Sequence, residues 1–578
     1  MISMIKFSQK YRQFFKNLIL LYQAHQRSLF ILFSIWGLYF LFLFIRVIKF
    51  NADGVSVSHV NVWSDWPLHT SMVNIFAYKN PQDWFAYHPI YADGKFTYGF
   101  LTNFISGMLI RAGFSLDLAL ILPSLLYIFS LLLGMYSLFN LVLRSQSQGL
   151  VAISLFFLSS GLGFIDFIVQ LIQDHSLNNF LNLSFFEQTL DYTRQEQYQW
   201  YSGNVIVGML LPQRAFLLGI TLAIWALVGI LYVFLDDPKN QQEHQLILFI
   251  SSLLSGILAI THMHSLIALF FILIPVFIVS YQQWQKSLFY YIIPTTIFAL
   301  TLYLIFISGG IESSKFMRWT PGWASQGGFG GWMMMWLKLW GLMIPVAVFG
   351  FSRLSGRSPE IKAFFFGFFL LFGVANLITF QPIPWDNSKL FLWVYLGFSG
   401  LAAKSLSLTW TAKTQWKIID KLSVIFLVII LSFSGFLELV RLQTSNYLLI
   451  TSNDDIRLGI KIRERTDTLA RFLTATSHNH LIMVWAARPI FMGYTAWVAN
   501  FGFLYEQREK DLKLMFKGSE NTANLLKKYR ISYVVIGPSE LNDFQANEEY
   551  YQSHFPLAFQ NQHYRIYDVR SLWSHPSN

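Results

Sequence analysis

The feature that most constrains this chain is a series of apolar runs, most of them near twenty residues long, separated by short polar segments. The first extends from about Leu29 to Ile48, long enough to cross a hydrocarbon core of about 30 Å as a helix. Charged residues make up only 13% of the chain, against roughly 25% in an average soluble domain. The sequence therefore predicts a mainly α-helical, polytopic membrane protein with about eleven transmembrane helices. The runs lie near residues 29–48, 116–143, 150–171, 206–235, 246–261, 265–282, 287–308, 331–351, 362–380, 389–407 and 422–441.

Basic loops give the expected orientation, because cytoplasmic loops of membrane proteins are enriched in Lys and Arg. Residues 404–421 contain four lysines and one aspartate, and 352–362 contain three cations and one glutamate. No acidic residue precedes Asp53, whereas five Lys or Arg residues precede the first run. We therefore expect a cytoplasmic N-terminus. Alternation then puts residues 172–205, 309–330, 381–388 and everything after about 442 outside the cell.

One apolar segment does not fit this alternation. Residues 98–112, "YGFLTNFISGMLIRA", are short for a span, and a crossing here would turn the lysine-rich 404–421 loop outward. We interpret the segment as a helix lying in the outer membrane interface. It would then belong to a first external loop of about residues 50–115.

The composition changes after Arg441, where residues 442–578 carry 15 Lys or Arg and 13 Asp or Glu. Strand-length apolar runs at 478–489 and 529–540, with a helical 523–530 segment before the second, predict a small α/β domain. We therefore divide the chain into a membrane domain, 1–441, and a soluble extracytoplasmic domain, 442–578. The net charge of +11 lies mostly in the membrane half, so we expect membrane lipid and no nucleic acid as a partner. Without cysteine, disulfide and thiolate chemistry are excluded.

The first external loop contains the stretch "SDWPLHT", residues 64–70. If it is helical, Asp65 and His69 at i and i+4 share one face. A reactive carboxylate beside an imidazole is one interpretation. The other is a helix start, in which Ser64 or Asp65 caps the first turn and Pro67 occupies a position that tolerates proline.

A long first external loop with an early acidic residue, followed by "HPIYADGKFTYGFLTNFISGMLIRAG", resembles the GT-C superfamily of integral membrane glycosyltransferases. The similarity is to bacterial relatives of the protein mannosyltransferases and aminoarabinose transferases, and to YfhO-type membrane proteins. It implies a polyprenyl-phosphate-linked sugar donor, a glycan, lipid or protein acceptor, and a bacterial plasma membrane. Asp65 then corresponds to the catalytic acidic residue. We expect His69 to orient Asp65 or the acceptor, and His88 and Trp66 to contact the substrate. His88 and Pro89 are similar to an "HPP" element of the family. This chain differs at Ile90, where the family usually has a second proline.

A lipid phosphate leaving group requires nearby cations, and three segments supply candidates. "PIPWDNSKLFLW" (382–393) contains Lys389, "LLPQRAFLLG" (210–219) contains Arg214, and "SSKFMRWTPGW" (313–323) contains Arg318. We expect these three cations to contact the donor phosphate, although long basic side chains also reach the interface without a partner. Beside Lys389, Asp386 and Asn387 are candidate substrate contacts.

The turn "THMHS" (261–265) places His262 and His264 two residues apart between apolar runs. Two histidines alone do not make a metal site, since a third protein ligand is normally needed. We therefore treat both as phosphate contacts and expect no metal site and no cofactor. A bound divalent metal is the alternative, and the sequence does not support it.

These observations favour an inverting glycosyltransferase that works on the extracytoplasmic side with Asp65 as general base. A transporter or flippase for a lipid-linked sugar is the main alternative, although such proteins usually contain internal repeats that this sequence lacks. A non-catalytic scaffold for envelope assembly is the third interpretation.

Overall fold

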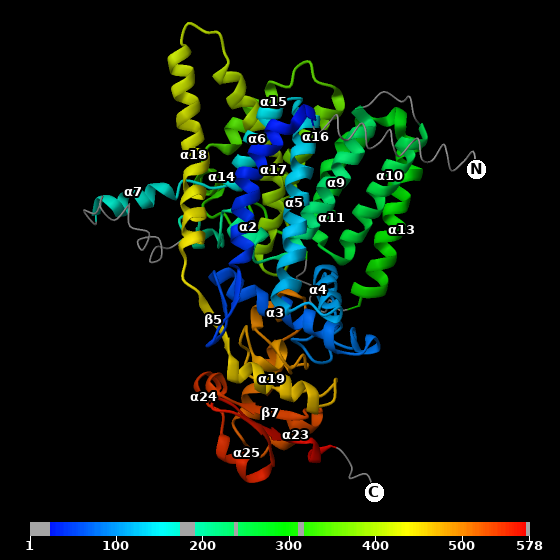
Figure 1. Cartoon of the computed structure of the whole chain (residues 1–578), viewed down its shortest axis with the longest axis vertical. Helices are drawn as coiled ribbons and strands as arrows, with labels where there is room; N and C mark the ends of the chain where they lie inside the picture. The colour runs from blue at the N-terminus through cyan, green and yellow to red at the C-terminus, as the bar shows by residue number, and fades with distance from the viewer. Residues whose placement is uncertain (1–22, 174–190, 236–240, 310–316, 574–578) are drawn as a thin grey trace.

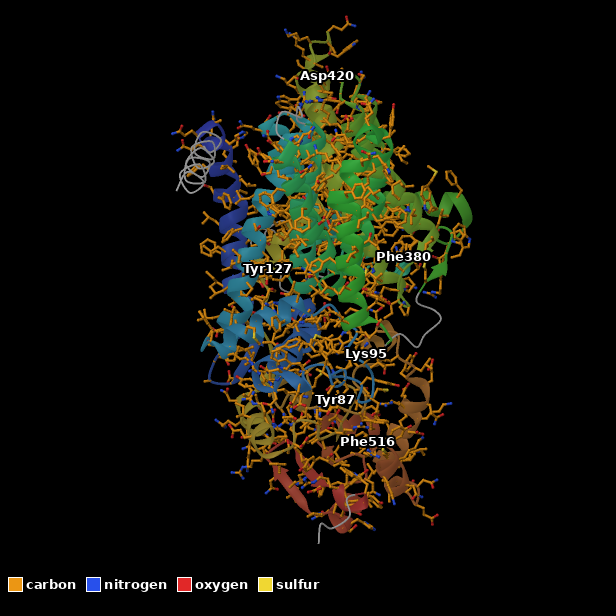
Figure 2. All side chains as sticks on the ribbon, turned by 90° about the vertical axis from the view of Figure 1, so that its right-hand side faces the viewer. Tyr87, Lys95, Tyr127, Phe380, Asp420 and Phe516 are labelled. Atoms are coloured by element: carbon orange, nitrogen blue, oxygen red, sulfur yellow. The ribbon has the colours of Figure 1, made fainter. Side chains whose placement is uncertain are left out.

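The computed structural model describes residues 23–173, 191–235, 241–309 and 317–573. These residues form a long helical bundle with a smaller, mixed part at one end (Figure 1). The C-terminal region (residues 448–573) makes up most of that smaller part. In the side-chain view, Asp420 of the lysine-rich loop lies at the opposite end of the molecule from Phe516 of the C-terminal region (Figure 2).

The bundle confirms a polytopic membrane protein but corrects the number of long spans. Among the described residues, eight helices are long and apolar enough to cross a membrane, or nine with one bent pair, against the eleven expected. The eight are Gln23–Ile45, which ends with α2 (Leu38–Ile45); α5 (Leu116–Leu143); α9 (Arg214–Leu235); Gln241–Ile260, which begins with α10 (Gln241–Gly256); Tyr281–Ile307, which contains α13 (Ile293–Leu302); α16 (Pro359–Leu377); Pro384–Trp410, which contains α17 (Ser388–Trp410); and α18 (Lys417–Thr444).

The 150–171 run is not one span. It folds as α6 (Gln146–Phe157) and α7 (Phe164–Gln173), and α7 projects sideways from the bundle (Figure 1). The break passes close to other backbone: a Cβ on Gly161 would lie 1.9 Å from the carbonyl oxygen of Lys338, and one on Gly163 1.5 Å from that of Tyr192. Only glycine permits both approaches. Non-helical backbone is tolerated at membrane depth where protein surrounds it.

Two further runs differ from simple spans. Residues 331–351 form α14 (Gly328–Trp340) and α15 (Met343–Ser352), bent by 90° at Gly341, whose φ is +58°. The 265–282 run forms α11 (Met263–Val279), a shorter apolar helix of 17 residues. Helix α17 is the most enclosed span and packs against α6, α15 and α16.

The first loop contributes β1 (Ile48–Phe50), β2 (Gly54–Val57), α3 (Val60–Tyr78) and α4 (Leu101–Arg111). Strand β2 pairs antiparallel with both β1 and β5 (Leu448–Ser452), so one sheet joins this loop to the chain after α18. Helix α4 has 11 residues and is about 16 Å long, too short to cross a bilayer. It packs on α3 at the end of the bundle (Figure 1).

The C-terminal region contains a four-stranded sheet of order β6-β7-β9-β8, in which only β6 and β7 are parallel. The predicted second strand is present as β7, with α23 directly before it, whereas the predicted 478–489 strand is wrong: the short helix α20 begins there, capped by the His480 side chain. The strands are β6 (Phe472–Leu473), β7 (Tyr533–Ile536), β8 (Leu557–Gln560) and β9 (Arg565–Asp568). The helices are α19 (Asn453–Arg465), α20 (Leu481–Val484), α21 (Thr495–Asn500), α22 (Glu506–Phe516), α23 (Thr522–Lys528), α24 (Pro538–Phe544) and α25 (Glu548–His554).

Candidate active site

A cavity of about 370 Å³ lies where the bundle meets the C-terminal region. Its wall combines side chains from the first loop, the start of α9, the turn before α11, the segment between α16 and α17, and the end of α21. Phe380, one of its lining residues, lies toward the end of the bundle that faces Lys95 and the C-terminal region (Figure 2). The lining includes Tyr98, Gln213, His262, His264, Lys389, Asn500 and Phe501.

Asp65 lies beside this cavity, in the second turn of α3. The helix is capped by His59, whose Nδ1 accepts a hydrogen bond from the Asn61 amide, so Asp65 is not the cap. Gln213, which lines the cavity, donates to Asp65 Oδ2 at 3.2 Å. Burial raises the pKa of Asp65 to about 6; Lys389 and the Gln213 hydrogen bond oppose the shift, and Asp386 adds to it. A carboxyl with such a pKa can take up a proton near neutral pH.

Lys389 and Asp386 form an ion pair at the first turn of α17. Both side chains are largely buried, and Lys389 contributes to the cavity wall. Asn387 fastens the turn between them, because its amide donates to the carbonyls of Ala375 (2.9 Å) and Ile378 (2.8 Å). The ion pair therefore stands in a fixed turn, while Asn387 is committed to backbone and does not line the cavity.

The two predicted histidines stand together in the cavity wall, with ring centroids 5.5 Å apart. His262 caps α11: its Nδ1 accepts from the Ser265 amide at 3.2 Å and lies 2.9 Å from the Ser265 hydroxyl. The Nε2 atoms of both histidines are buried and have no hydrogen-bond partner among the described residues. A buried polar atom without a partner is costly, so this wall offers two unused positions to a polar ligand.

His69 and Arg214 form a separate network under α3. Arg214 donates to Asn103 Oδ1 at 3.3 Å and to the Ser106 hydroxyl at 2.7 Å, and His69 Nδ1 lies 3.2 Å from the same Asn103 oxygen. Burial, with a contribution from Arg214, lowers the pKa of His69 to about 3, so the imidazole is neutral. Neither side chain lines the cavity, and Arg214 joins α9 to α4.

The other three sequence candidates do not line the cavity. Trp66 is in the core and donates to the Leu211 carbonyl at 3.1 Å, and Arg318 donates to the Pro382 carbonyl at 2.8 Å. His88 is completely buried among aromatic rings, 4.9 Å from that of Phe501, which itself forms cavity wall.

Sequence reasoning missed Gln213, Tyr98, Asn500 and Phe501, all of which line the cavity. Gln213 is next to Arg214 and was within reach of the same argument. The pair Asn500 and Phe501 carries no local signal, since it reaches the cavity only through the packing of the C-terminal region on the first loop. Within the described ranges, no group of three or more His, Asp or Glu side chains is placed to hold a metal ion.

The chain is thus a multi-pass membrane protein with a cavity to whose wall its C-terminal region contributes Asn500 and Phe501. No protein-family model matches the chain, and no curated protein sequence matches it.

Among solved structures, it is similar to the Archaeoglobus fulgidus oligosaccharyltransferase in complex with Zn and sulfate, over 88% of this chain and 68% of that one, with 12% identity and a TM-score of 0.48. The apo form of that enzyme gives 88% and 70%, 14% identity and 0.44. ArnT from Cupriavidus metallidurans bound to undecaprenyl phosphate gives 93% and 98%, 10% identity and 0.45. All three TM-scores are below 0.5, and similarity at this level does not decide what this chain does.

Proposed function

We propose that this chain is a membrane glycosyltransferase that moves a sugar from a polyprenyl-phosphate-linked donor to an acceptor hydroxyl. The proposal rests on Asp65. The pKa of its carboxyl is raised to about 6, and the carboxyl accepts a hydrogen bond from Gln213 of the cavity wall. The same wall contains the cation Lys389 and two histidine nitrogens without partners among the described residues. A base, a cation and free donors together match what this transfer needs.

In the proposed reaction, the acceptor oxygen attacks the anomeric carbon of the donor sugar while Asp65 takes the acceptor proton. The bond between the anomeric carbon and the phosphate oxygen breaks, and polyprenyl phosphate leaves with the electron pair. Lys389 stabilises the negative charge on that phosphate, and His262 and His264 donate hydrogen bonds to it. Because one displacement occurs on the face opposite the leaving group, the anomeric configuration inverts.

Arg214 and His69 act as positioning residues in this proposal. Their bonds to Asn103 hold α4 and α9 against α3, the helix that carries Asp65. Asn387 does the same for the turn of Asp386 and Lys389.

We also propose the orientation of the chain: a cytoplasmic N-terminus, a membrane domain of residues 1–441, and an extracytoplasmic domain of residues 442–578 over the cavity. The support is the distribution of charge, since the lysine-rich 404–421 loop lies at the end of the bundle away from the C-terminal region (Figure 2). The active site would then work at the outer leaflet of a bacterial plasma membrane.

The test is Asp65→Asn, compared with Asp53→Asn, an exposed carboxylate in the same loop. A strain that lacks the protein is complemented with the wild type or either variant, and the sugar composition of its lipid, glycan and protein fractions is measured. Loss of a general base typically slows a reaction by about 10²–10⁴-fold, so Asp65→Asn should leave the composition of the deletion strain and Asp53→Asn should restore it. Restoration by Asp65→Asn, at equal protein levels, would refute the base assignment.

A transporter of the lipid-linked sugar predicts a different result. Purified protein in vesicles would then move donor across the bilayer in the absence of any acceptor. Asp65→Asn would not need to affect that movement.

A further inference from the structure

Four aromatic side chains form a cluster that joins α3 to the C-terminal region: Trp63, His478, Tyr494 and Trp497. The centroids of the His478 and Tyr494 rings lie 3.8 Å apart, with the ring planes tilted by 34°. The Trp497 ring is nearly perpendicular to both, at 5.0 Å from His478 and 5.7 Å from Tyr494. Trp63 approaches His478 from α3, at 5.5 Å. All four side chains are partly exposed, so the cluster is reached by solvent.

The polar edges of this cluster are largely unused. Trp63 Nε1 donates to the Leu449 carbonyl at 3.2 Å. Among the described residues, no hydrogen bond joins the two ring nitrogens of His478, the Tyr494 hydroxyl or Trp497 Nε1 to another protein atom. These three side chains are partly exposed, so their hydrogen-bonding groups are open to a ligand from solution.

The cluster contains no charged side chain. Burial lowers the pKa of His478 to about 4, so its imidazole is neutral near pH 7, with one donor and one acceptor nitrogen. The cluster therefore offers aromatic faces and neutral hydrogen-bonding edges, and it has no cation for an anionic ligand. Its free polar groups also make it a poor surface for acyl chains, where unsatisfied polar groups are costly.

Two elements join this cluster to the candidate active site. Trp63 is two residues before Asp65 in α3, and Trp497 is three residues before Asn500 in α21. Asn500 and the following Phe501 form part of the cavity wall. A molecule bound on the cluster is thus held by the same two helices that carry the proposed base and the roof of the cavity.

We propose that the cluster formed by Trp63, His478, Tyr494 and Trp497 binds an uncharged saccharide unit of the acceptor, which makes the acceptor a glycan. Sugar rings present C–H faces that pack on aromatic rings and hydroxyls that both donate and accept hydrogen bonds. The four free polar groups and the partly exposed rings match both halves of that surface. The proposal rests on the glycosyltransferase function proposed above and names the class of acceptor at that site.

The test uses the full-length protein in detergent and an array of defined oligosaccharides, one set neutral and one set anionic. The wild type should bind members of the neutral set. Trp497→Ala and Tyr494→Ala should each weaken that binding by about tenfold, because each loses an aromatic contact together with a hydrogen bond. Trp497→Phe keeps a ring and loses only the N–H, so it should lose less.

Two controls separate this proposal from the function on which it rests. Trp416→Ala removes an exposed tryptophan at the start of α18, at the end of the bundle away from the C-terminal region, and should bind like the wild type. Asp65→Asn should bind the same neutral oligosaccharides and fail only in transfer. Thermal unfolding identifies any variant that does not fold, and Trp497→Phe then replaces Trp497→Ala.

Binding confined to the anionic set, or neutral binding that Trp497→Ala and Tyr494→Ala leave intact, would overturn the glycan assignment while leaving the Asp65 proposal standing. Transfer that survives Asp65→Asn would instead remove the proposed function itself.

Discussion

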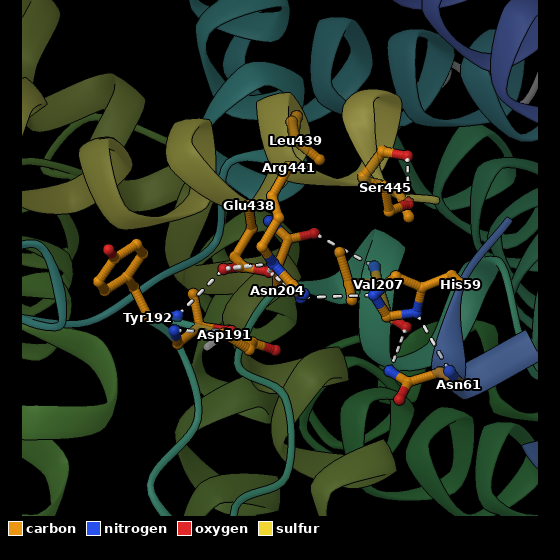
Figure 3. Close-up of polar contacts among 12 residues, drawn as sticks. His59, Asn61, Asp191, Tyr192, Asn204, Val207, Glu438, Leu439, Arg441 and Ser445 are labelled. Carbon is orange, nitrogen blue, oxygen red and sulfur yellow. Dashed lines mark hydrogen bonds and ion pairs between the residues drawn. The ribbon is translucent and has the colours of Figure 1, made fainter. Parts of the chain in front are cut away.

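Two ion pairs with the same spacing occupy very different surroundings in this molecule. Asp386 and Lys389 at the start of α17, and Glu438 and Arg441 near the end of α18, are both i,i+3 pairs with a largely buried carboxylate. The Glu438 carboxylate accepts three bonds from Arg441, at 2.7, 3.0 and 3.3 Å, and a fourth from the Tyr192 backbone amide at 3.0 Å (Figure 3). Every partner of that carboxylate is a fixed part of the protein.

The second pair also joins distant segments. Arg441 reaches toward His59, the cap of α3, at 3.3 Å, and nearby Ser445 donates to the Ser58 carbonyl at 2.6 Å (Figure 3). The α17 pair, by contrast, faces a cavity whose histidine nitrogens have no partner among the described residues. An ion pair in a span therefore indicates function only where the groups around it leave hydrogen-bonding positions open to a ligand.

The largest effect is expected in the α18 pair, and it should be an effect on stability. Glu438→Gln leaves the largely buried Arg441 without its ion-pair partner, and breaking a buried pair in this way costs about 3–5 kcal/mol. The double variant Glu438→Gln/Arg441→Gln removes both charges and should recover much of that loss. Thermal unfolding of the purified protein measures both. If the single variant unfolds like the wild type, the α18 pair does not have the structural role that we assign to it.

A somewhat smaller effect, on activity, is expected in the α17 pair. Lys389→Met removes the cation proposed for the leaving phosphate, and loss of one such group typically slows transfer by about 10²–10³-fold. Lys389→Met also leaves the buried Asp386 without its ion-pair partner, so a loss of stability should accompany the loss of transfer. Transfer is measured by the recovery of sugar composition in the complemented deletion strain.

The double variant Asp386→Asn/Lys389→Met is the matched control for that experiment. It should restore stability without restoring transfer. If it restores both, the α17 pair is structural, like the α18 pair, and the two regions do not differ.

Part of this architecture could be predicted because its signals are local. Apolar runs gave the positions of the helical segments, and the helix before β7 followed from the spacing within residues 523–540. The break between α6 and α7 could not be predicted, because the contacts of Gly161 and Gly163 involve backbone of Lys338 and Tyr192, far away in the sequence. The strand predicted at 478–489 is wrong for a related reason. The apolar residues there are buried by tertiary packing, and His480 caps a short helix, α20, at this position.

The candidate site could likewise be predicted only where its signals are local. Asp386 and Lys389 stand out in the sequence, because charged residues at the edge of an apolar run are costly. Glu438 and Arg441 have the same spacing, and their different surroundings appear only when loop 191–207 and the cap of α3 are packed against α18. Trp66 shows the opposite case, since its place beside Asp65 in the sequence puts it on the buried side of α3.

The smallest expected effect links stability and activity through Asp65. Its pKa is raised from 3.8 to about 6, so the folded state favours the protonated form. An acid with a raised pKa makes the fold less stable as pH rises from its unfolded pKa to its folded pKa, and the cost stays constant above that. Asp65→Asn lacks this cost, so it should be more stable than the wild type near pH 8, by up to about 3 kcal/mol, and about equally stable near pH 4.

Transfer should follow the same titration in the opposite sense, because only the ionised carboxyl can accept the acceptor proton. Wild-type activity should therefore rise through about pH 6, the pKa of Asp65. Lys389 is one of the groups that lower this pKa, so the residual activity of Lys389→Met should rise only at higher pH. Transfer in vesicles over a range of pH, beside unfolding of the same preparations, measures both curves. A pH profile that Lys389→Met does not move would mean that the cation and the proposed base do not share one site.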